Sequence, residues 1–126
     1  MIVLDTSALL FWTLDPLKLS PVARREIDAT ERLMISSISV WEIALKVGQA
    51  KLEIKPTIEE YVAGLIRLDR LAIEPVDVAT WLASVALDWQ HRDPADRVIV
   101  ATAMHYDCPL VTSDRTIAEF YAHTVW

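Results

Sequence analysis

The residues best suited to joint chemistry in this chain are four acids that lie far apart in the sequence: Asp5, Glu42, Asp96 and Asp114. Two unit charges about 4 Å apart repel by roughly 1 kcal/mol in bulk water and by about 4 kcal/mol at an effective dielectric of 20. Carboxylates that gather at one edge of a fold therefore need protons or cations. Since oxygen ligands without His or Cys favour Mg²⁺ or Mn²⁺ over Zn²⁺, the four acids predict a magnesium or manganese site.

Two of these acids also have a structural explanation as helix N-caps. Asp5 begins the segment Asp5–Ser7 and Asp114 ends the segment Thr112–Asp114, and both segments contain only Asp, Ser and Thr. All three residue types accept hydrogen bonds from the free amides of a first helical turn. Capping alone therefore accounts for either residue when it is considered by itself.

The other two acids have structural explanations of a different kind. Glu42 and Lys46 stand at i and i+4 of an expected helix, in the order that favours an exposed ion pair. Pro94 fits the first position of another helix, which makes Asp93 its N-cap and places Asp96 in its first turn. A negative charge there complements the helix dipole. A first-turn position also directs Asp96 toward the edge where the other acids are expected.

The elements that must position these acids follow from the apolar pattern. Short apolar runs without alternation are typical of strands buried on both faces of a parallel sheet. Five such segments occur, the last as an edge strand: Ile2–Leu4, Leu33–Ile35, Leu71–Ile73, Leu110–Val111 and His123–Trp126. Helices are expected to start at Ser20, at Ser37 (running to about Gly48), at Pro56–Thr57 and at Asp93. This alternation predicts an α/β fold, a three-layer α/β/α sandwich with a central parallel sheet.

The predicted topology brings the acids together. Ligand sites in such folds gather at the carboxyl edge of the sheet, where strands lead into helices. Asp5 ends the first predicted strand, and Asp114 follows the strand near Leu110–Val111. Both therefore belong to that edge, and their joint placement favours one shared site over independent caps and surface charges.

Composition indicates a single domain over residues 1–126. Apolar residues make up 53% of the chain and charged residues 24%, a globular balance that can bury a core without disulfides. The single Cys108 excludes an internal disulfide and suits a reducing compartment, so we expect a cytoplasmic protein. No basic leader precedes the first strand and no run approaches the roughly 20 apolar residues of a membrane span, so no membrane partner is expected.

Four segments together resemble the PIN-domain ribonucleases, and among these the VapC-type toxins of bacterial and archaeal toxin–antitoxin pairs. Each segment is weakly diagnostic alone, but their order and spacing cover nearly the whole chain. They are Asp5–Leu10 (DTSALL), Ser39–Ala44 (SVWEIA), His91–Arg97 (HRDPADR) and Pro109–Asp114 (PLVTSD). Ala95 stands where a bulkier residue is common in the family, a departure that leaves the acids untouched.

The resemblance implies an endoribonuclease that uses Mg²⁺ or Mn²⁺ and leaves 5′-phosphate and 3′-hydroxyl ends. The family's acidic positions fall on the four acids described above, with no departure among them. Asp5, Asp96 and Asp114 are expected to hold one or two cations. Glu42 is expected to bind the metal through water or to orient the nucleophile.

The resemblance also suggests helper groups and partners, and the basic residues beside the acids in the sequence suggest phosphate contacts. The expected helpers are the hydroxyls of Thr6, Ser7 and Ser113. Candidate phosphate contacts, for which surface charge balance is the alternative, are Lys46, Arg92, Arg97 and Arg115. His91 is expected to pack at the helix entry. The implied partners are RNA, an antitoxin that silences the protein, and a second copy of the chain, since five Trp in a small protein predict exposed apolar patches of the kind that mark interfaces.

Other functions are weighed against this one. A phosphoacceptor receiver domain shares the length and acidity, but the first strand here ends in one acid and no Lys follows Lys55. A haloacid-dehalogenase-type phosphatase needs Asp-x-Asp where this chain has Asp5–Ser7. A housekeeping PIN-domain nuclease and a non-catalytic binding domain stay open. The net charge of −6 argues against a plain nucleic-acid-binding module, although divalent cations invert the field of a carboxylate cluster.

Overall fold

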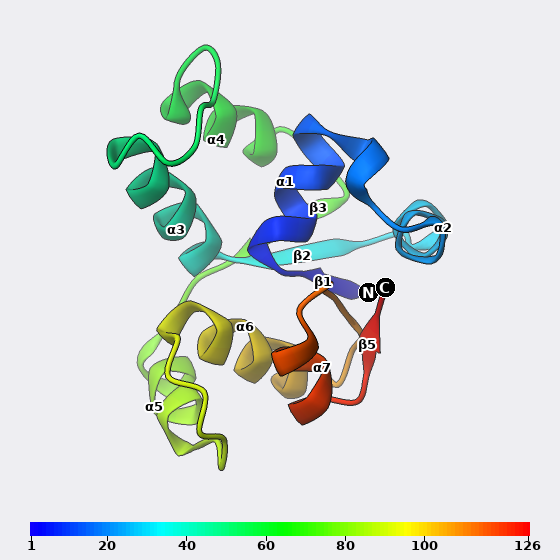
Figure 1. Cartoon of the computed structure of the whole chain (residues 1–126), viewed down its shortest axis with the longest axis vertical. Coiled ribbons are helices and arrows are strands. Elements are labelled where there is room, and N and C mark those ends of the chain that lie inside the picture. The colour runs from blue at the N-terminus through cyan, green and yellow to red at the C-terminus, as the bar shows by residue number, and fades with distance from the viewer.

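The apolar segments form one five-stranded, entirely parallel sheet in the computed structural model, which describes residues 1–126 (Figure 1). Its strand order is β3-β2-β1-β4-β5, so the first strand of the sequence lies at the centre. The strands are β1 (Ile2–Leu4), β2 (Leu33–Ser36), β3 (Leu71–Glu74), β4 (Leu110–Val111) and β5 (Thr124–Val125). Helices cover both faces of the sheet, which confirms the predicted α/β/α sandwich.

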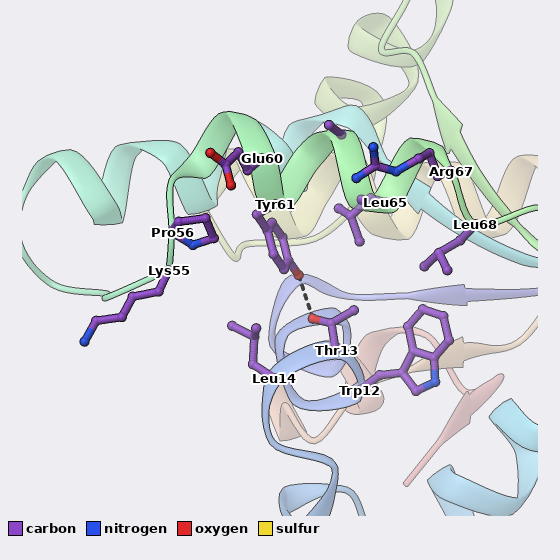
Figure 2. Close-up of a pocket in the computed structure, with 12 residues that line it drawn as sticks. Trp12, Thr13, Leu14, Lys55, Pro56, Glu60, Tyr61, Leu65, Arg67 and Leu68 are labelled. Atoms are coloured by element: carbon purple, nitrogen blue, oxygen red, sulfur yellow. Dashed lines mark hydrogen bonds between the residues drawn. The ribbon is translucent and has the colours of Figure 1, made fainter.

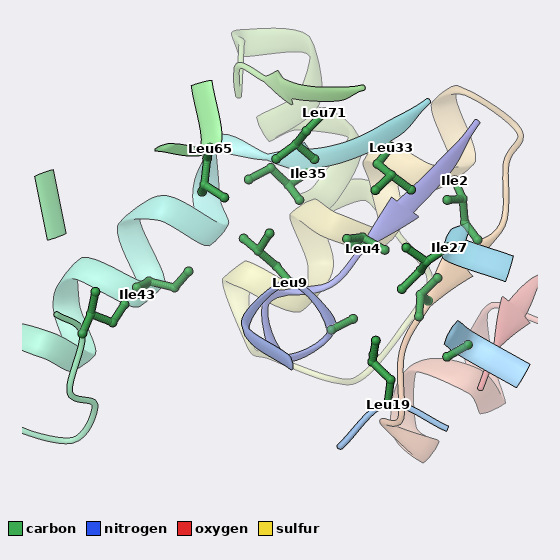
Figure 3. Packing of buried hydrophobic residues seen from close by; sticks show 14 residues of the cluster. Ile2, Leu4, Leu9, Leu19, Ile27, Leu33, Ile35, Ile43, Leu65 and Leu71 are labelled. Carbon is green, nitrogen blue, oxygen red and sulfur yellow. The ribbon is translucent and has the colours of Figure 1, made fainter. Parts of the chain in front are cut away.

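Alternating side chains of the strands pack into two separate cores. In β1, Ile2 and Leu4 join the cluster under α1 (Thr6–Leu14), α2 (Pro21–Ala29) and α4 (Ile58–Ile66), which Figure 3 shows around Leu9 and Ile27. Val3 points to the opposite cluster, formed with α6 (Pro94–His105) and α7 (Arg115–Phe120). Both faces of the sheet are therefore buried, which explains why its strands read as continuous apolar runs.

Helix starts agree with the capping residues of the sequence. Ser20, Thr57 and Asp93 cap α2, α4 and α6 with their side chains, as predicted. The cap of α3 (Ser37–Gly48) is Ser36, one residue before the expected position. A further helix, α5 (Val78–Ala86), was not expected from the sequence and packs against α6. No helix is both long and apolar enough to cross a membrane.

The carboxyl edge of the sheet receives side chains from four elements. Asp5 follows β1 directly and caps α1, and Asp114 follows β4 and caps α7. β2 leads into α3, which carries Glu42, and the first turn of α6 carries Asp96. Because β1 lies between β2 and β4, the turns after these three strands are neighbours.

Candidate active site

Asp5 is the most deeply buried of the four acids, with 6% of its surface exposed. Its Oδ1 accepts a hydrogen bond from the amide of Ala8 at 2.7 Å, so it does act as an N-cap. Burial is the largest effect on its carboxyl and raises its pKa to about 6, against hydrogen bonds from Thr112 and Ala8 that lower it. The negative charges of Asp96 and Asp114 raise this pKa further. Both carboxylates are therefore close enough to Asp5 to interact with it electrostatically.

Asp96 is held from two directions at the start of α6. Its backbone amide donates to Oδ1 of Asp93 at 3.0 Å, which identifies Asp93 as the cap and Asp96 as a first-turn residue. Its Oδ2 lies 2.7 Å from Nε2 of His91. Burial raises the pKa of Asp96, the His91 hydrogen bond lowers it, and the charges of Asp93 and Asp114 raise it.

Asp114 caps α7 and completes the group of aspartates. Its Oδ1 accepts a hydrogen bond from the amide of Thr116 at 2.8 Å and a longer one from Ile117 at 3.4 Å. The Thr112 hydroxyl accepts a hydrogen bond from the Asp114 amide at 3.0 Å, and it lies close enough to Asp5 to lower the pKa of that carboxyl. Thr112 therefore ties the turn after β4 to the end of β1, and capping does not exclude a role for Asp114 in a shared site.

Glu42 reaches the site through Thr6, the residue that follows Asp5. The Thr6 hydroxyl donates to Oε1 of Glu42 at 2.5 Å and lies 2.9 Å from the Ser39 hydroxyl, which can donate to it in turn. No ion pair forms between Glu42 and Lys46. The carboxylate is thus held toward α1, not along its own helix.

The donor set suits a hard divalent cation. No Lys or Arg forms an ion pair with any of the four acids, so the buried charge of Asp5 has only like charges near it. Uncompensated carboxylates of this kind are the preferred ligands of Mg²⁺ and Mn²⁺. Asp5, Asp96 and Asp114 are the residues that would hold such an ion. In the present arrangement, no three His, Cys, Asp or Glu side chains surround one point as a bound metal requires.

The basic residues suggested as phosphate contacts divide into two kinds. The guanidinium of Arg97 donates to five backbone carbonyls at 2.6 to 3.2 Å, those of Ser84, Val85, Leu87, Trp89 and His91. Its donors are used to hold the segment before α6, which favours a structural role. Arg92 and Arg115 are exposed, Lys46 is half-buried, and none of the three has an ion-pair partner.

The hydroxyl helpers also differ in their surroundings. Thr6 is buried and bound to Glu42, whereas Ser7 and Ser113 are exposed and have no side-chain hydrogen bond. The sequence did not indicate a role in the site for Thr112 or Ser39. For His91 it predicted only packing at the entry to the helix. His91 does pack on Trp89, with ring centroids 4.8 Å apart, and it contacts Asp96 as well. The sequence feature that could have indicated the contact with Asp96 is that His91 stands only five residues before it.

A large hollow lies away from the four acids, between α1 and α4 (Figure 2). It has a volume of about 810 Å³, and Trp12, Tyr61 and Leu68 are among the residues that line it. The hydroxyls of Thr13 and Tyr61 are 2.7 Å apart and join the two helices at this point. Since it contains none of the four acids, this hollow is a separate surface from the acidic site.

Comparison with known proteins agrees with this geometry. The chain is 31% identical to Ribonuclease VapC22 of Mycobacterium tuberculosis (strain ATCC 25618 / H37Rv), over 99% of this chain and 98% of that protein. Its fold is similar to that of a toxin–antitoxin complex from Klebsiella pneumoniae, with a TM-score of 0.69, 18% identity and coverage of 100% of this chain and 97% of the other.

A second similar structure is VapBC2 from Rickettsia felis bound to a DNA fragment from its promoter, with a TM-score of 0.67, 18% identity and coverage of 95% and 93%. The family model of the PIN domain matches residues 2–122, a span that includes all four acids and every strand of the sheet except the last. With aspartates at the carboxyl edge of its parallel sheet and a family match over nearly its whole length, the chain belongs to the PIN-domain family.

Proposed function

We propose that this chain is a metal-dependent endoribonuclease that hydrolyses RNA phosphodiester bonds and serves as the toxin of a type II toxin–antitoxin pair. The observation that carries the proposal is the group formed by Asp5, Asp96 and Asp114, whose charges act on one another in a PIN-domain chain related to a ribonuclease. The proposed cofactor is Mg²⁺ or Mn²⁺.

Hydrogen bonds hold three of the proposed carboxylates in place, those of Asp5, Glu42 and Asp96. A divalent cation bound by Asp5, Asp96 and Asp114 would lower the pKa of bound water and neutralise charge on the attacked phosphate. The Ala8 amide fixes Oδ1 of Asp5, and His91 fixes Oδ2 of Asp96. Thr6 holds Oε1 of Glu42 and leaves the other carboxylate oxygen to accept a proton or to orient a water molecule.

The proposed protein partners are an antitoxin and a second copy of the chain. The similar structure from Klebsiella pneumoniae is a toxin–antitoxin complex, which supports an antitoxin partner here. The hollow between α1 and α4 offers aromatic and aliphatic walls to an apolar antitoxin segment. On the other side, Trp41 of α3 and Trp81 of α5 are 54% and 45% exposed and line one apolar cavity, which supports a homodimer through these helices.

Expression in a bacterial host tests the function directly. Wild type is compared with Asp5→Ala, while growth and intact RNA species are followed together. Growth arrest with RNA loss in the wild type alone supports the proposal. RNA cleavage by purified protein that continues unchanged in EDTA removes the metal mechanism, and the lack of any cleavage in Mn²⁺ removes the nuclease. Release from arrest by the product of an adjacent upstream reading frame separates a toxin from a housekeeping enzyme.

A further inference from the structure

A third cavity lies directly beside the acidic site, at the segment between α5 and α6. It has a volume of about 650 Å³ and is lined by Val85, Trp89, Gln90, His91, Arg92 and Arg97. His91 belongs both to its wall and to the site, because its Nε2 contacts Oδ2 of Asp96. A ligand in this cavity would therefore be one side chain away from the acids.

The walls of this cavity are fixed although four of the six lining residues lie in the irregular segment between α5 and α6. The five hydrogen bonds of Arg97 hold the carbonyls of the segment from Ser84 to His91. The ring of Trp89 stacks on Phe120 of α7, with centroids 4.7 Å apart and planes inclined by 10°. A ligand would meet a preformed surface, so little conformational entropy is lost when it binds.

Two polar side chains of the wall are left without partners. Arg92 and Gln90 are exposed, and neither forms an ion pair or a side-chain hydrogen bond. A guanidinium presents donors that match a phosphate, and a primary amide presents both a donor and an acceptor to a base edge. In a chain of net charge −6, a free cation beside an acidic site is suited to hold the polyanion that the acids repel.

We propose that this cavity is a subsite for one nucleotide of the RNA strand next to the scissile phosphate, with Arg92 on the backbone phosphate and Gln90 on the base. The inference rests on the proposed ribonuclease function and specifies how its substrate is held. Arg97, in contrast, contacts no phosphate, because its donors are bound to the protein's own backbone.

The salt dependence of RNA binding tests this assignment. Asp5→Asn serves as a cleavage-deficient background whose changed residue does not line the cavity. Binding of a labelled single-stranded RNA in Mg²⁺ is measured by fluorescence anisotropy at several KCl concentrations. Loss of one phosphate contact reduces the slope of log affinity against log salt by about 0.7 for single strands. Arg92→Ala should show this reduction, whereas Gln90→Ala should keep the slope and change the preference among bases.

Arg25→Ala is the matched control, since Arg25 is an exposed and unpaired arginine on α2. It should leave both affinity and slope unchanged, and melting curves show that each variant is folded. If wild type cleaves RNA but Arg92→Ala binds like Arg25→Ala, the subsite is wrong and the nuclease stands. If wild type neither binds nor cleaves RNA, the proposed function and the subsite both fail.

Discussion

The Nε2 atom of His91 lies 2.7 Å from Oδ2 of Asp96, with 26% and 20% of the two side chains exposed. An ionised carboxylate only accepts hydrogen bonds, so the imidazole must donate through Nε2. Trp89 packs against the same ring, which limits its rotation. His91 thus positions a proposed metal ligand without being a ligand itself, and hydrogen bonds of this kind orient ligands in metal sites.

Replacing His91 should therefore weaken the metal site. His91→Leu removes the donor, and we expect it to raise the Mn²⁺ concentration needed for thermal stabilisation and for RNA cleavage by about 10- to 100-fold. His91→Gln keeps a donor amide and should recover part of the loss. The measurement is the melting temperature of each protein at increasing Mn²⁺ concentration. If wild type and His91→Leu are stabilised at the same Mn²⁺ concentration, this hydrogen bond does not act on the site.

Asp93 and Asp96 allow a paired test that distinguishes a helix-capping aspartate from a metal-binding one. Asp93 caps α6 through Oδ1, a role that Asn performs about as well as Asp, so Asp93→Asn should change stability by less than about 1 kcal/mol and keep most activity. Asp96→Asn should abolish RNA cleavage in Mn²⁺. In EDTA its stability should hold or rise, since one of several crowded carboxylates is removed. Loss of cleavage in Asp93→Asn alone would reverse the two assignments.

The raised pKa of Asp5 predicts a specific dependence of stability on pH. The carboxyl titrates near 6 in the folded state and near 3.8 when unfolded, so the folded state binds this proton more tightly. Below about pH 4 the carboxyl of Asp5 is protonated in both states, so its burial does not lower the free energy of unfolding. As pH rises from about 4 through 6, its ionisation should lower the free energy of unfolding by about 3 kcal/mol in the absence of metal.

Asp5→Asn removes this titration and keeps the acceptor for the Ala8 amide. In EDTA the variant should be the more stable protein above pH 6, and the difference should vanish toward pH 4. Saturating Mn²⁺ should reverse the order at pH 7, because a ligand that binds the folded wild type raises its stability. Denaturant unfolding of both proteins across this pH range measures the effect, and a pH-independent difference would contradict it.

Much of the fold followed from local sequence patterns, and α5 is the exception. Strands such as Ile2–Leu4 are apolar on both faces because both faces are buried, and caps such as Ser20 mark their helices directly. In α5, by contrast, the apolar residues Val78, Leu82 and Val85 are between 67% and 77% exposed. Asp77, Thr80 and Ser84 recur at helical spacing and Asp77 caps the helix, but apolar residues occupy the outer face of α5 too, so the segment lacks the division into an apolar and a polar face that marks a surface helix.

The positions of the four acids in the fold were predictable from the sequence, whereas their hydrogen-bond partners were not. Asp5 and Asp114 could be placed because each follows a strand whose apolar run is evident. The bond between Thr6 and Glu42 joins residues 36 positions apart, so it depends on how α1 and α3 pack. The same holds for Arg97, whose charge in the sequence gives no sign of the five carbonyls it binds.

The exposed apolar face of α3 and α5 should form the proposed dimer contact. Trp81→Glu places a charge in the cavity that Trp41 and Trp81 share, and we expect it to convert a dimer into a monomer. Leu17→Glu is the control, because Leu17 is 87% exposed and lies in the short 3-10 turn Pro16–Lys18, outside this face. Light scattering at micromolar concentrations gives the mass of each protein. A monomeric wild type, or a dimeric Trp81→Glu, would contradict the assignment.

The two glycines of the chain provide a paired test of the hollow between α1 and α4. Gly64 lines this hollow on α4, and Gly48 ends α3 outside it. A Cβ atom at either position meets no atom within 4 Å apart from its chain neighbours and its own helix backbone, so both positions have space where a side chain begins. Gly64→Phe should therefore fold, with stability equal to or above that of the wild type, because Gly is unfavourable by up to about 1 kcal/mol inside a helix.

Gly64→Phe fills the hollow from within the protein's own helix and leaves the acids untouched. RNA cleavage in Mn²⁺ should stay at the wild-type rate, while the proposed antitoxin should no longer bind or silence the variant, since its apolar segment has lost its place. Gly48→Phe should cleave RNA and be silenced as the wild type is. The measurements are cleavage rates with increasing antitoxin and the dissociation constant for each variant. If Gly64→Phe and Gly48→Phe are silenced alike, the antitoxin binds elsewhere on the molecule.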